Sequence, residues 1–331
     1  MRVMKAGEDA AVQEAAQWFA QGGLLAFPTE TVYGLGARAD SPQAVQQIFA
    51  AKGRPPTHPL IVHVADAAAA QPFAASWPDL AQRLTQAFWP GPLTVIVPRR
   101  DGVAGDAAGG QASIGLRCPS HPVAHALLGA AARLGVPGIA APSANRFGRV
   151  SPTRAEHVIS EFQDLDDLWV LDGGACSEGI ESAIVDCSRG RPVLLRPGTL
   201  ARDRIEAAAG MALQAPDAAA PRAPGTLAAH YAPRARVRLM PSPMLAAALE
   251  VLASNGGAPA LAVAVYSRTV RVPPAAPWRQ MPPDAAAAAH ELFLALRELD
   301  ASGAPLIWVE QPPDTPEWDG VRDRLQRAAA A

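Results

Sequence analysis

The amino-acid sequence predicts an α/β fold in which a twisted, open mixed sheet is followed by a smaller α/β domain. Short apolar runs typical of buried strands alternate with stretches of helical length through residue 207. An alanine- and proline-rich stretch, residues 208–226, then interrupts the alternation and is typical of a linker. Three strand–helix pairs follow it, which favours a small doubly wound second domain.

Capping and breaking residues bound the helices expected in the first domain. Glycines 22–23 end the first helix, and Ser41 can cap the second, with Pro42 at its first position. Ser120 and Thr153 can open two later helices. We expect helices at 9–21, 42–51, 79–88, 120–134 and 153–159.

Apolar runs bounded by glycine, proline or polar residues predict the strands. In the first domain we expect strands at 24–27, 60–64, 93–98, 113–117, 138–142, 168–174, 182–188 and 192–198. In the second we expect strands at 237–240, 260–267 and 306–311, and helices at 243–254, 284–299 and 316–329. The chain thus divides into a first domain (1–207), a linker (208–233) and a second domain (234–331).

The composition narrows the class of protein. The chain has 331 residues, 49% of them hydrophobic, and a formal net charge of −2, so a broad affinity for nucleic acid is not expected. Cys118, Cys176 and Cys187 show no zinc-type spacing and suit a reducing compartment. No stretch has the length of a membrane span or the pattern of a secretory signal. We therefore expect a soluble cytoplasmic protein without membrane contact.

Hydroxyl side chains crowd the segment FPTETVYGLGA at residues 27–37. Gly34–Ala39 formally matches the dinucleotide-binding pattern G-x-G-x-x-A, but six residues separate it from the preceding strand, and no acidic residue stands where a ribose ligand belongs. We therefore reject that interpretation. Thr29, Thr31 and Tyr33 can instead exchange hydrogen bonds with a small polar ligand.

A basic cluster follows, in which Lys52, Arg54, His58 and His63 lie within twelve positions. A solvated loop is the simple alternative, and His63 can also be an ordinary core histidine. A loop at the edge of an α/β sheet commonly lines a crevice, and two fixed cations there suit a carboxylate or a phosphate. The histidines lack a third ligand nearby, so no metal site is expected.

Two further stretches add polar groups. In SIGLRCP, Ser113 and Arg117 share one strand face among apolar neighbours, which favours an arginine directed at an anion. In APSANRFGRVSPT, Ser143, Asn145 and Ser151 lie between a strand and a helix, where such side chains and backbone N–H groups form an anion cradle. Neither a Walker P-loop nor a G-x-S-x-G elbow occurs.

The order of these motifs resembles a known family. Between about residues 10 and 205 the chain carries, in order, PTETVYGLG, KGRP with HPLIVH, WPGPLT, RCPSHP, APSAN with SPT, DGG, ESAIVD and LLRPG. Together they resemble the YrdC-like threonylcarbamoyl-AMP synthase family. The tail, with GTLAAHYAP at 225–233 and DRLQRAA near the end, is similar to the extra domain of the two-domain branch.

The resemblance implies a fold and a reaction. The fold is a twisted YrdC-like α/β sheet with a large concave cleft, followed by a smaller Rossmann-like domain. The activity is that of an L-threonylcarbamoyladenylate synthase, a nucleotidyltransferase that uses L-threonine, bicarbonate and ATP with Mg²⁺ and releases pyrophosphate. The product serves threonylcarbamoyladenosine (t6A) formation on tRNA. The implied partners are a downstream tRNA threonylcarbamoyl-transferase complex and, weakly, tRNA itself.

Carried over residue by residue, the resemblance implies two neighbouring sites. The threonine site falls on Thr31, His63, Arg117, Ala141 and Ser182. The ATP site falls on Lys52, Arg54, His58, Ser113, Ser143, Asn145, Ser151, Arg196 and Tyr231. Of these, His58 stands where many members have asparagine.

The implied chemistry needs no protein nucleophile. Lys52 and Arg54 are the expected catalytic pair and hold the phosphates with Mg²⁺, while the threonine carbamate attacks the α-phosphate. Arg117 is expected to pair with the threonine carboxylate. The linker, which ends near Tyr231, acts either as a lid over the cleft or as a passive tether.

Two other classes of function stay open at this point. An RNA-binding protein could use the basic cleft without chemistry, but the net charge and the shortage of interleaved aromatics count against it. A hydrogenase-maturation carbamoyltransferase also contains a YrdC-like unit. Such proteins add acylphosphatase and zinc-finger segments, which this sequence lacks.

Overall fold

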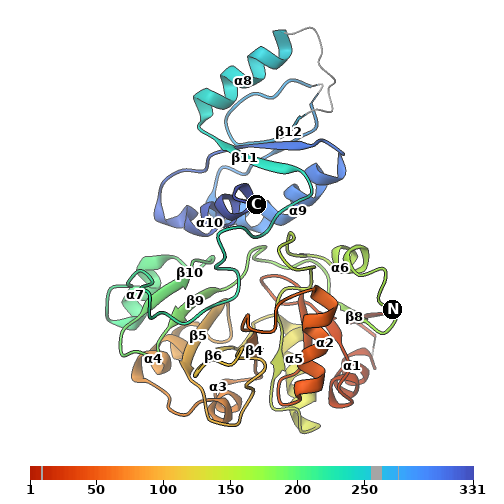
Figure 1. The fold of residues 1–331 in the computed structure, drawn as a ribbon, viewed down its shortest axis with the longest axis vertical. Coiled ribbons are helices and arrows are strands. Elements are labelled where there is room, and N and C mark those ends of the chain that lie inside the picture. Colours follow the sequence, from red (N-terminus) through yellow and green to blue (C-terminus); the bar gives the residue numbers. More distant parts are fainter. Residues whose placement is uncertain (9, 255–262, 275) are drawn as a thin grey trace. The chain divides into compact units, whose positions relative to one another are not determined.

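The computed structural model describes the chain except residues 9, 255–262 and 275, and it divides into two compact units (Figure 1). The first unit comprises Met1–Phe147 and Ser151–Thr226, and the second comprises Gly148–Val150 and Leu227–Ala331. Each unit is built on a sheet of its own. Among the described residues, no helix combines the length and the apolar character of a membrane span.

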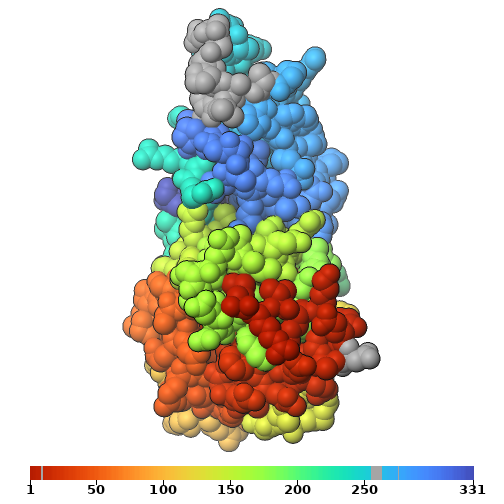
Figure 2. Space-filling model, turned by 90° about the vertical axis from the view of Figure 1, so that its right-hand side faces the viewer, coloured from red at the N-terminus to blue at the C-terminus, as the bar shows by residue number. Residues whose placement is uncertain are grey.

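A mixed sheet of ten described strands forms the first unit, in the order β1-β8-β2-β3-β7-β4-β6-β5-β9-β10. Its strands are β1 (Arg2–Lys5), β2 (Leu25–Phe27), β3 (Gly34–Arg38), β4 (Ile61–His63), β5 (Leu93–Pro98), β6 (Ser113–Arg117), β7 (Ile139–Ala140), β8 (Trp169–Asp172), β9 (Ala183–Asp186) and β10 (Val193–Arg196). Strand β1 pairs in parallel with β8, and Figure 2 shows the N-terminal segment in red against the green segment of the first unit. The predicted mixed sheet is confirmed.

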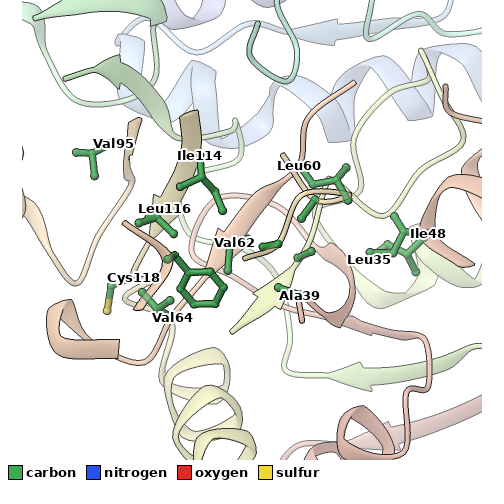
Figure 3. Close-up of a cluster of buried hydrophobic side chains, with 14 of the residues drawn as sticks. Leu35, Ala39, Ile48, Leu60, Val62, Val64, Val95, Ile114, Leu116 and Cys118 are labelled. Atoms are coloured by element: carbon green, nitrogen blue, oxygen red, sulfur yellow. The ribbon is translucent and has the colours of Figure 1, made fainter. Parts of the chain in front are cut away.

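Helices cover one face of this sheet. They are α2 (Pro42–Lys52), α3 (Ala67–Ala70), η1 (Gln71–Phe73), α4 (Asp79–Phe88), α6 (Ala155–Glu161) and α7 (Arg202–Ala209). They pack on the main apolar core, to which the central strands contribute Val62, Leu116 and Val95 (Figure 3). Since side chains alternate along a strand, His63 and Arg117 point to the opposite face.

The opposite face is covered in two different ways. Helices α1 (Ala11–Ala20) and α5 (Pro122–Arg133) pack on β2 and β7 around a second core that includes Phe27 and Ile139. Over β4, β5, β9 and β10, this face instead carries a small apolar cluster of Ile61, Ile96, Ile184, Val193, Leu195 and Ala223. Ala223 belongs to the expected linker, so the linker takes the place of a helix at this end.

The second unit has a four-stranded, all-parallel sheet in the order β11-β14-β12-β13. Its elements are β11 (Arg236–Met240), α8 (Ser242–Ser254), β12 (Val263–Ser267), β13 (Trp278–Gln280), α9 (Ala285–Ala301), β14 (Leu306–Glu310), η2 (Pro316–Trp318) and α10 (Asp319–Ala329). This order confirms the smaller parallel α/β domain. The short strand β13 was not predicted, and residues 260–262 of the expected strand 260–267 lie outside the described residues.

The first predicted helix cap is confirmed. Pro42 begins α2, and the Ser41 hydroxyl accepts a hydrogen bond from the backbone N–H of Ala44 at 3.3 Å. Gly53 ends the same helix with φ of 61°, a conformation that costs glycine little.

Two other predicted caps are wrong by one position. The cap of α5 is His121, whose Nδ1 accepts the N–H of Val123, so Ser120 lies one residue too early. Helix α6 begins at Ala155 after Arg154, which provides no side-chain cap. Thr153 is buried, and its own backbone N–H donates to His157 Nδ1.

The glycines of the opening motif form a strand rather than a flexible loop. Strands β2 and β3 are antiparallel, with Phe27 opposite Gly34, so residues 28–33 form a hairpin connection. A Cβ atom on Gly36 would lie 2.7 Å from Ile139 Cγ2 and 2.8 Å from the Phe27 ring. Gly36 therefore permits close packing, and the rejection of a dinucleotide-binding loop agrees with this geometry.

Candidate functional site

The central strands bring the predicted threonine-site residues to one sheet face. Strands β4 and β6 are parallel, with His63 opposite Arg117, and the backbone N–H of Ala141 donates to the Ile61 carbonyl. Ser113 and Gly115 line a pocket on the same face. The predicted common face of residues 113, 115 and 117 is thus found in the structure.

The hairpin connection after β2 is held rigid by its own hydroxyls. Thr29 Oγ1 donates to the Val32 carbonyl at 2.6 Å and accepts the backbone N–H groups of Thr31 and Val32. Tyr33 Oη donates to the Gly174 carbonyl at 2.7 Å. Two of the three hydroxyls that we expected to face a ligand therefore serve the fold, while Thr31 is fully buried beside Thr29, with 2.9 Å between the two hydroxyl oxygens.

A buried ion pair joins this connection to the end of β6. Arg117 Nη2 lies 2.8 Å from Glu30 Oε1, and both side chains are about 95% buried. Burial raises the pKa of Glu30, but the charge of Arg117, together with hydrogen bonding from Arg117 and from the backbone of Glu30 and Ser120, holds the pKa below its usual value. Glu30 was not among the predicted site residues, because a loop has no periodicity that singles out one position.

His63 is a neutral imidazole in this arrangement. Burial, together with the charge of Arg117, lowers the pKa of His63 to about 3. Its ring meets the Phe27 ring edge to face at a centroid distance of 6.0 Å. Its Nδ1 has no hydrogen-bond partner among the described residues, so this atom is available to a bound ligand.

Ser182 connects the two predicted sites. Its hydroxyl lies 2.8 Å from Thr94 Oγ1 and accepts a hydrogen bond from Arg196 Nη2 at 3.3 Å. Arg196 Nε also donates to the Ser182 carbonyl at 3.1 Å. A residue of the predicted threonine-binding site, Ser182, is therefore in direct contact with a residue of the predicted ATP-binding site, Arg196. Thr94 was missed because its single hydroxyl stands within the apolar run of β5.

Lys52 is hydrogen-bonded to the loop at residues 143–145, which belongs to the predicted anion-binding site. Its ammonium group donates to the Ser143 carbonyl at 2.6 Å and also to the Asn145 carbonyl. Only 3% of the residue is exposed, and this burial lowers the pKa of Lys52 well below its usual value. Its predicted contact with phosphate stays a prediction.

Three other predicted ATP-site residues of the first unit, Arg54, His58 and Ser151, contact their own neighbours. Arg54 Nη2 donates to the Pro59 carbonyl at 2.9 Å, and its guanidinium carbon lies 5.5 Å from the centre of the Phe147 ring. The His58 ring meets the same phenylalanine at 5.3 Å. Ser151 Oγ donates to Glu181 Oε1 at 2.5 Å. Glu181 thus joins the set, although its position before β9 carried only a weak signal.

The expected linker covers part of this face. Arg222 and Pro224 line a narrow pocket together with Ile61, Thr94, Ser113 and Gly115. The Gln111 side chain forms two hydrogen bonds with the Arg222 backbone. Gln111 Nε2 donates to the Arg222 carbonyl at 3.1 Å, and Gln111 Oε1 accepts the Arg222 N–H at 2.8 Å. Arg196 Nη1 donates to the Pro224 carbonyl at 3.0 Å. Arg222 Nη2 also donates to the Gly109 carbonyl at 3.3 Å, so the segment around Gly109 and Gln111 holds the linker.

Comparison with known families identifies the chain. Residues 17–198 match the family model described as "Telomere recombination", and residues 199–330 match the threonylcarbamoyl-AMP synthase C-terminal domain. The chain belongs to the threonylcarbamoyl-AMP synthase family. The resemblance carried by the ordered motifs is confirmed.

Relatives from several organisms match most of this family member. The threonylcarbamoyl-AMP synthase of Pyrococcus abyssi is 40% identical over 71% of this chain and 69% of that protein. That of Schizosaccharomyces pombe is 33% identical over 92% of this chain and 85% of that protein. The solved structure of P. abyssi Sua5 complexed with L-threonine has a TM-score of 0.88 and 34% identity, and covers 99% of this chain and 97% of that one.

One predicted ATP-site residue of this threonylcarbamoyl-AMP synthase family member lies in the second unit. Tyr231 is 1% exposed and has φ of 61°. Its ring packs 5.4 Å from the Phe293 ring, and the Arg324 guanidinium carbon lies 5.4 Å from its centre. The assignment of Tyr231 to ATP stays a prediction.

Proposed function

We propose that this chain is an L-threonylcarbamoyladenylate synthase, which forms threonylcarbamoyl-AMP and pyrophosphate from L-threonine, bicarbonate and ATP. The observation that carries the proposal is the contact of Ser182 with Arg196, which supports neighbouring sites for threonine and nucleotide, since the two residues are predicted to belong one to each site. Family membership and the 34% identity to a Sua5 protein complexed with L-threonine support the choice of substrate.

The residues act by positioning and by charge in this proposal. Bicarbonate first condenses with the threonine amine to a carbamate, with loss of water. The carbamate oxygen then attacks the α-phosphorus, the bond from phosphorus to the bridging oxygen breaks, and pyrophosphate leaves. The protein is thus a nucleotidyltransferase that contributes no nucleophile. Arg54 and Arg196 neutralise the phosphates, and Lys52 keeps the 143–145 loop in place for them.

Mg²⁺ enters the proposal as the companion of ATP. Among the described residues, no three His, Cys, Asp or Glu side chains form a metal-binding group. Mg²⁺ commonly keeps several waters and binds substrate phosphates through few protein ligands, so a Mg²⁺–ATP substrate is compatible with this donor set. When bound, it would neutralise charge on the phosphates.

We infer that the chain has three parts, which are a catalytic domain (1–207), a linker that acts as a lid (208–233) and a second domain (234–331). The pocket beside Ser113 has about 10 Å³ of free space, roughly one water molecule. A nucleotide could therefore reach Ser113 only if Arg222 and Pro224 move. This requirement supports a lid over a passive tether.

The product defines the partners. A threonylcarbamoyl-adenylate is an activated acyl donor, so a tRNA threonylcarbamoyl-transferase complex would consume it during t6A formation in the cytoplasm. A weak contact with tRNA itself belongs to the same proposal.

Product analysis tests the proposed function. The protein is incubated with ATP, Mg²⁺, bicarbonate and labelled threonine, quenched, and analysed for a threonine-containing AMP adduct and pyrophosphate. We expect the adduct only when threonine and bicarbonate are both present. Pyrophosphate release that does not depend on threonine would contradict the substrate, and strong salt-dependent tRNA binding without any pyrophosphate would favour an RNA-binding protein instead.

A further inference from the structure

In the predicted threonine site, a buried carboxylate and a buried guanidinium both have atoms that lack a hydrogen-bond partner. No group among the described residues forms a hydrogen bond of full geometry with either carboxylate oxygen of Glu30, or with Nε or Nη2 of Arg117, although Arg117 and the backbone of Glu30 and Ser120 lie near enough to lower the pKa of Glu30. The two groups are 2.8 Å apart and form a buried ion pair. Buried polar groups are almost always hydrogen-bonded, and a buried ion pair is costly unless its remaining donors and acceptors are satisfied. This pair therefore indicates a polar ligand.

Both charges are held in place by the backbone. Glu30 lies in the hairpin connection that Thr29 braces, and its carbonyl accepts the N–H of Glu178 at 2.7 Å. Arg117 ends β6, and its carbonyl accepts the N–H of Val64 at 2.9 Å. The separation of the two charges is thus set by the sheet and the hairpin, so it can select a ligand by shape.

An α-amino acid fits this pair better than any singly charged group. Its carboxylate matches the planar guanidinium of Arg117, and its ammonium group is a three-way donor that matches the open acceptors of Glu30. Neutral His63, with Nδ1 open, lies beside Arg117 for a side-chain hydroxyl. A carboxylate alone would leave Glu30 unsatisfied and would be repelled by it.

We propose that Glu30 binds the ammonium group of the amino-acid substrate while Arg117 binds its carboxylate, so that the pair recognises a zwitterion. The proposal rests on the proposed function and names the group that recognises the amine. Glu30 serves as a binding and positioning residue and receives no proton. Arg117 holds the pKa of Glu30 below its usual value. The Glu30 carboxylate is therefore too weak a base to take a proton from an ammonium group.

The test compares ligands on the unmodified protein. Binding is measured by calorimetry, in the presence of a non-hydrolysable ATP analogue, for L-threonine and for 2,3-dihydroxybutanoate, in which a hydroxyl replaces the ammonium group. We expect the hydroxy acid to bind roughly 10- to 100-fold more weakly. Equal affinities would overturn the proposal whatever any variant does.

The variant Glu30→Gln keeps the shape and removes the charge. We expect it to weaken L-threonine binding by a similar factor while 2,3-dihydroxybutanoate binds unchanged or better. Equal weakening of both ligands would mean that Glu30 only supports Arg117, and would overturn the proposal. Unchanged affinity for the ATP analogue confirms that the variant is folded.

Failure of the proposed function gives a different result. Unmodified protein that binds neither ligand and forms no adduct refutes the threonine-dependent synthase, and the role of Glu30 falls with it. Protein that forms the adduct but does not distinguish the two ligands refutes only the role of Glu30.

Discussion

Lys52 lies on the last turn of α2 with its ammonium group turned inward to two carbonyls of the 143–145 loop. The sequence indicated an anion-binding cation but could not reveal this inward contact, because its partners lie more than 90 positions away. Asp, Glu and phosphate are the usual partners of a lysine, whereas here the backbone is the acceptor. Loss of the side chain should therefore disturb the cradle itself.

We expect Lys52→Met to lower the rate of adduct formation by about 100-fold or more, since charge-assisted hydrogen bonds contribute about 1.5–3 kcal/mol each. Steady-state kinetics with ATP and threonine varied separately provide the measurement. Lys5→Met, at an exposed position of β1, is the matched control. Near-normal turnover of Lys52→Met would remove Lys52 from the site.

Protonation of the single residue His63 makes the free energy of unfolding depend on pH. Its pKa is about 3 in the folded protein against an ordinary value of 6.5, so the unfolded chain takes up a proton first as the pH falls. The contribution of His63 is present above pH 6.5 and is lost progressively as the pH falls from 6.5 towards 3. We expect it to lower the free energy of unfolding by about 2 kcal/mol between pH 7 and pH 5.

Urea unfolding at the two pH values, compared between the original protein and His63→Leu, isolates this contribution. The variant should lose less stability on acidification, whereas His125→Leu, at an exposed position of α5, should behave like the original. Identical pH dependence in all three proteins would contradict a buried neutral imidazole.

Strands were easier to predict than the connections between them. Period-two alternation identified β6 and its face correctly, because one side of the strand packs in the main core. The same reasoning missed β3, whose two glycines have no side chains to show a pattern, and α7, which runs into the alanine-rich stretch. Glu30 and Thr94 were missed for the related reason that a single polar residue in a loop or an apolar strand has no repeating neighbour.

The linker is held by specific contacts, and these can be weakened without touching the predicted substrate residues. Gln111→Ala removes both hydrogen bonds to the Arg222 backbone. These bonds are partly exposed, so we expect a loss of about 1 kcal/mol, seen as a roughly fivefold change in the KM for ATP with the KM for threonine unchanged. Gln82→Ala, on the exposed side of α4, is the control. A KM for ATP equal in all three proteins would favour a passive tether.

Over the whole molecule, the sequence predicted two α/β parts with an alanine- and proline-rich stretch between them, and the two sheets agree with that prediction. It could not predict that Gly148–Val150 belongs to the second unit. The Ala232 N–H donates to the Gly148 carbonyl at 2.8 Å, and Arg297 donates to the Val150 carbonyl. These partners lie 84 and 147 positions apart in sequence, beyond the reach of any local pattern.

The contacts of Gly148–Val150 within the second unit lead to a prediction about the predicted ATP site. Residues 148–150 are joined covalently to Asn145 on one side and to Ser151 on the other through a few bonds, so their position limits that of both predicted ATP residues. We expect Arg297→Ala to raise the KM for ATP several-fold and to leave threonine binding unchanged, because the predicted threonine residues belong to the first unit. Arg238→Ala, exposed on β11, provides the control for a lost surface charge. An equal effect of both variants would show that the lost positive charge, rather than the contact with Val150, is responsible. A change in threonine binding alone would contradict the prediction.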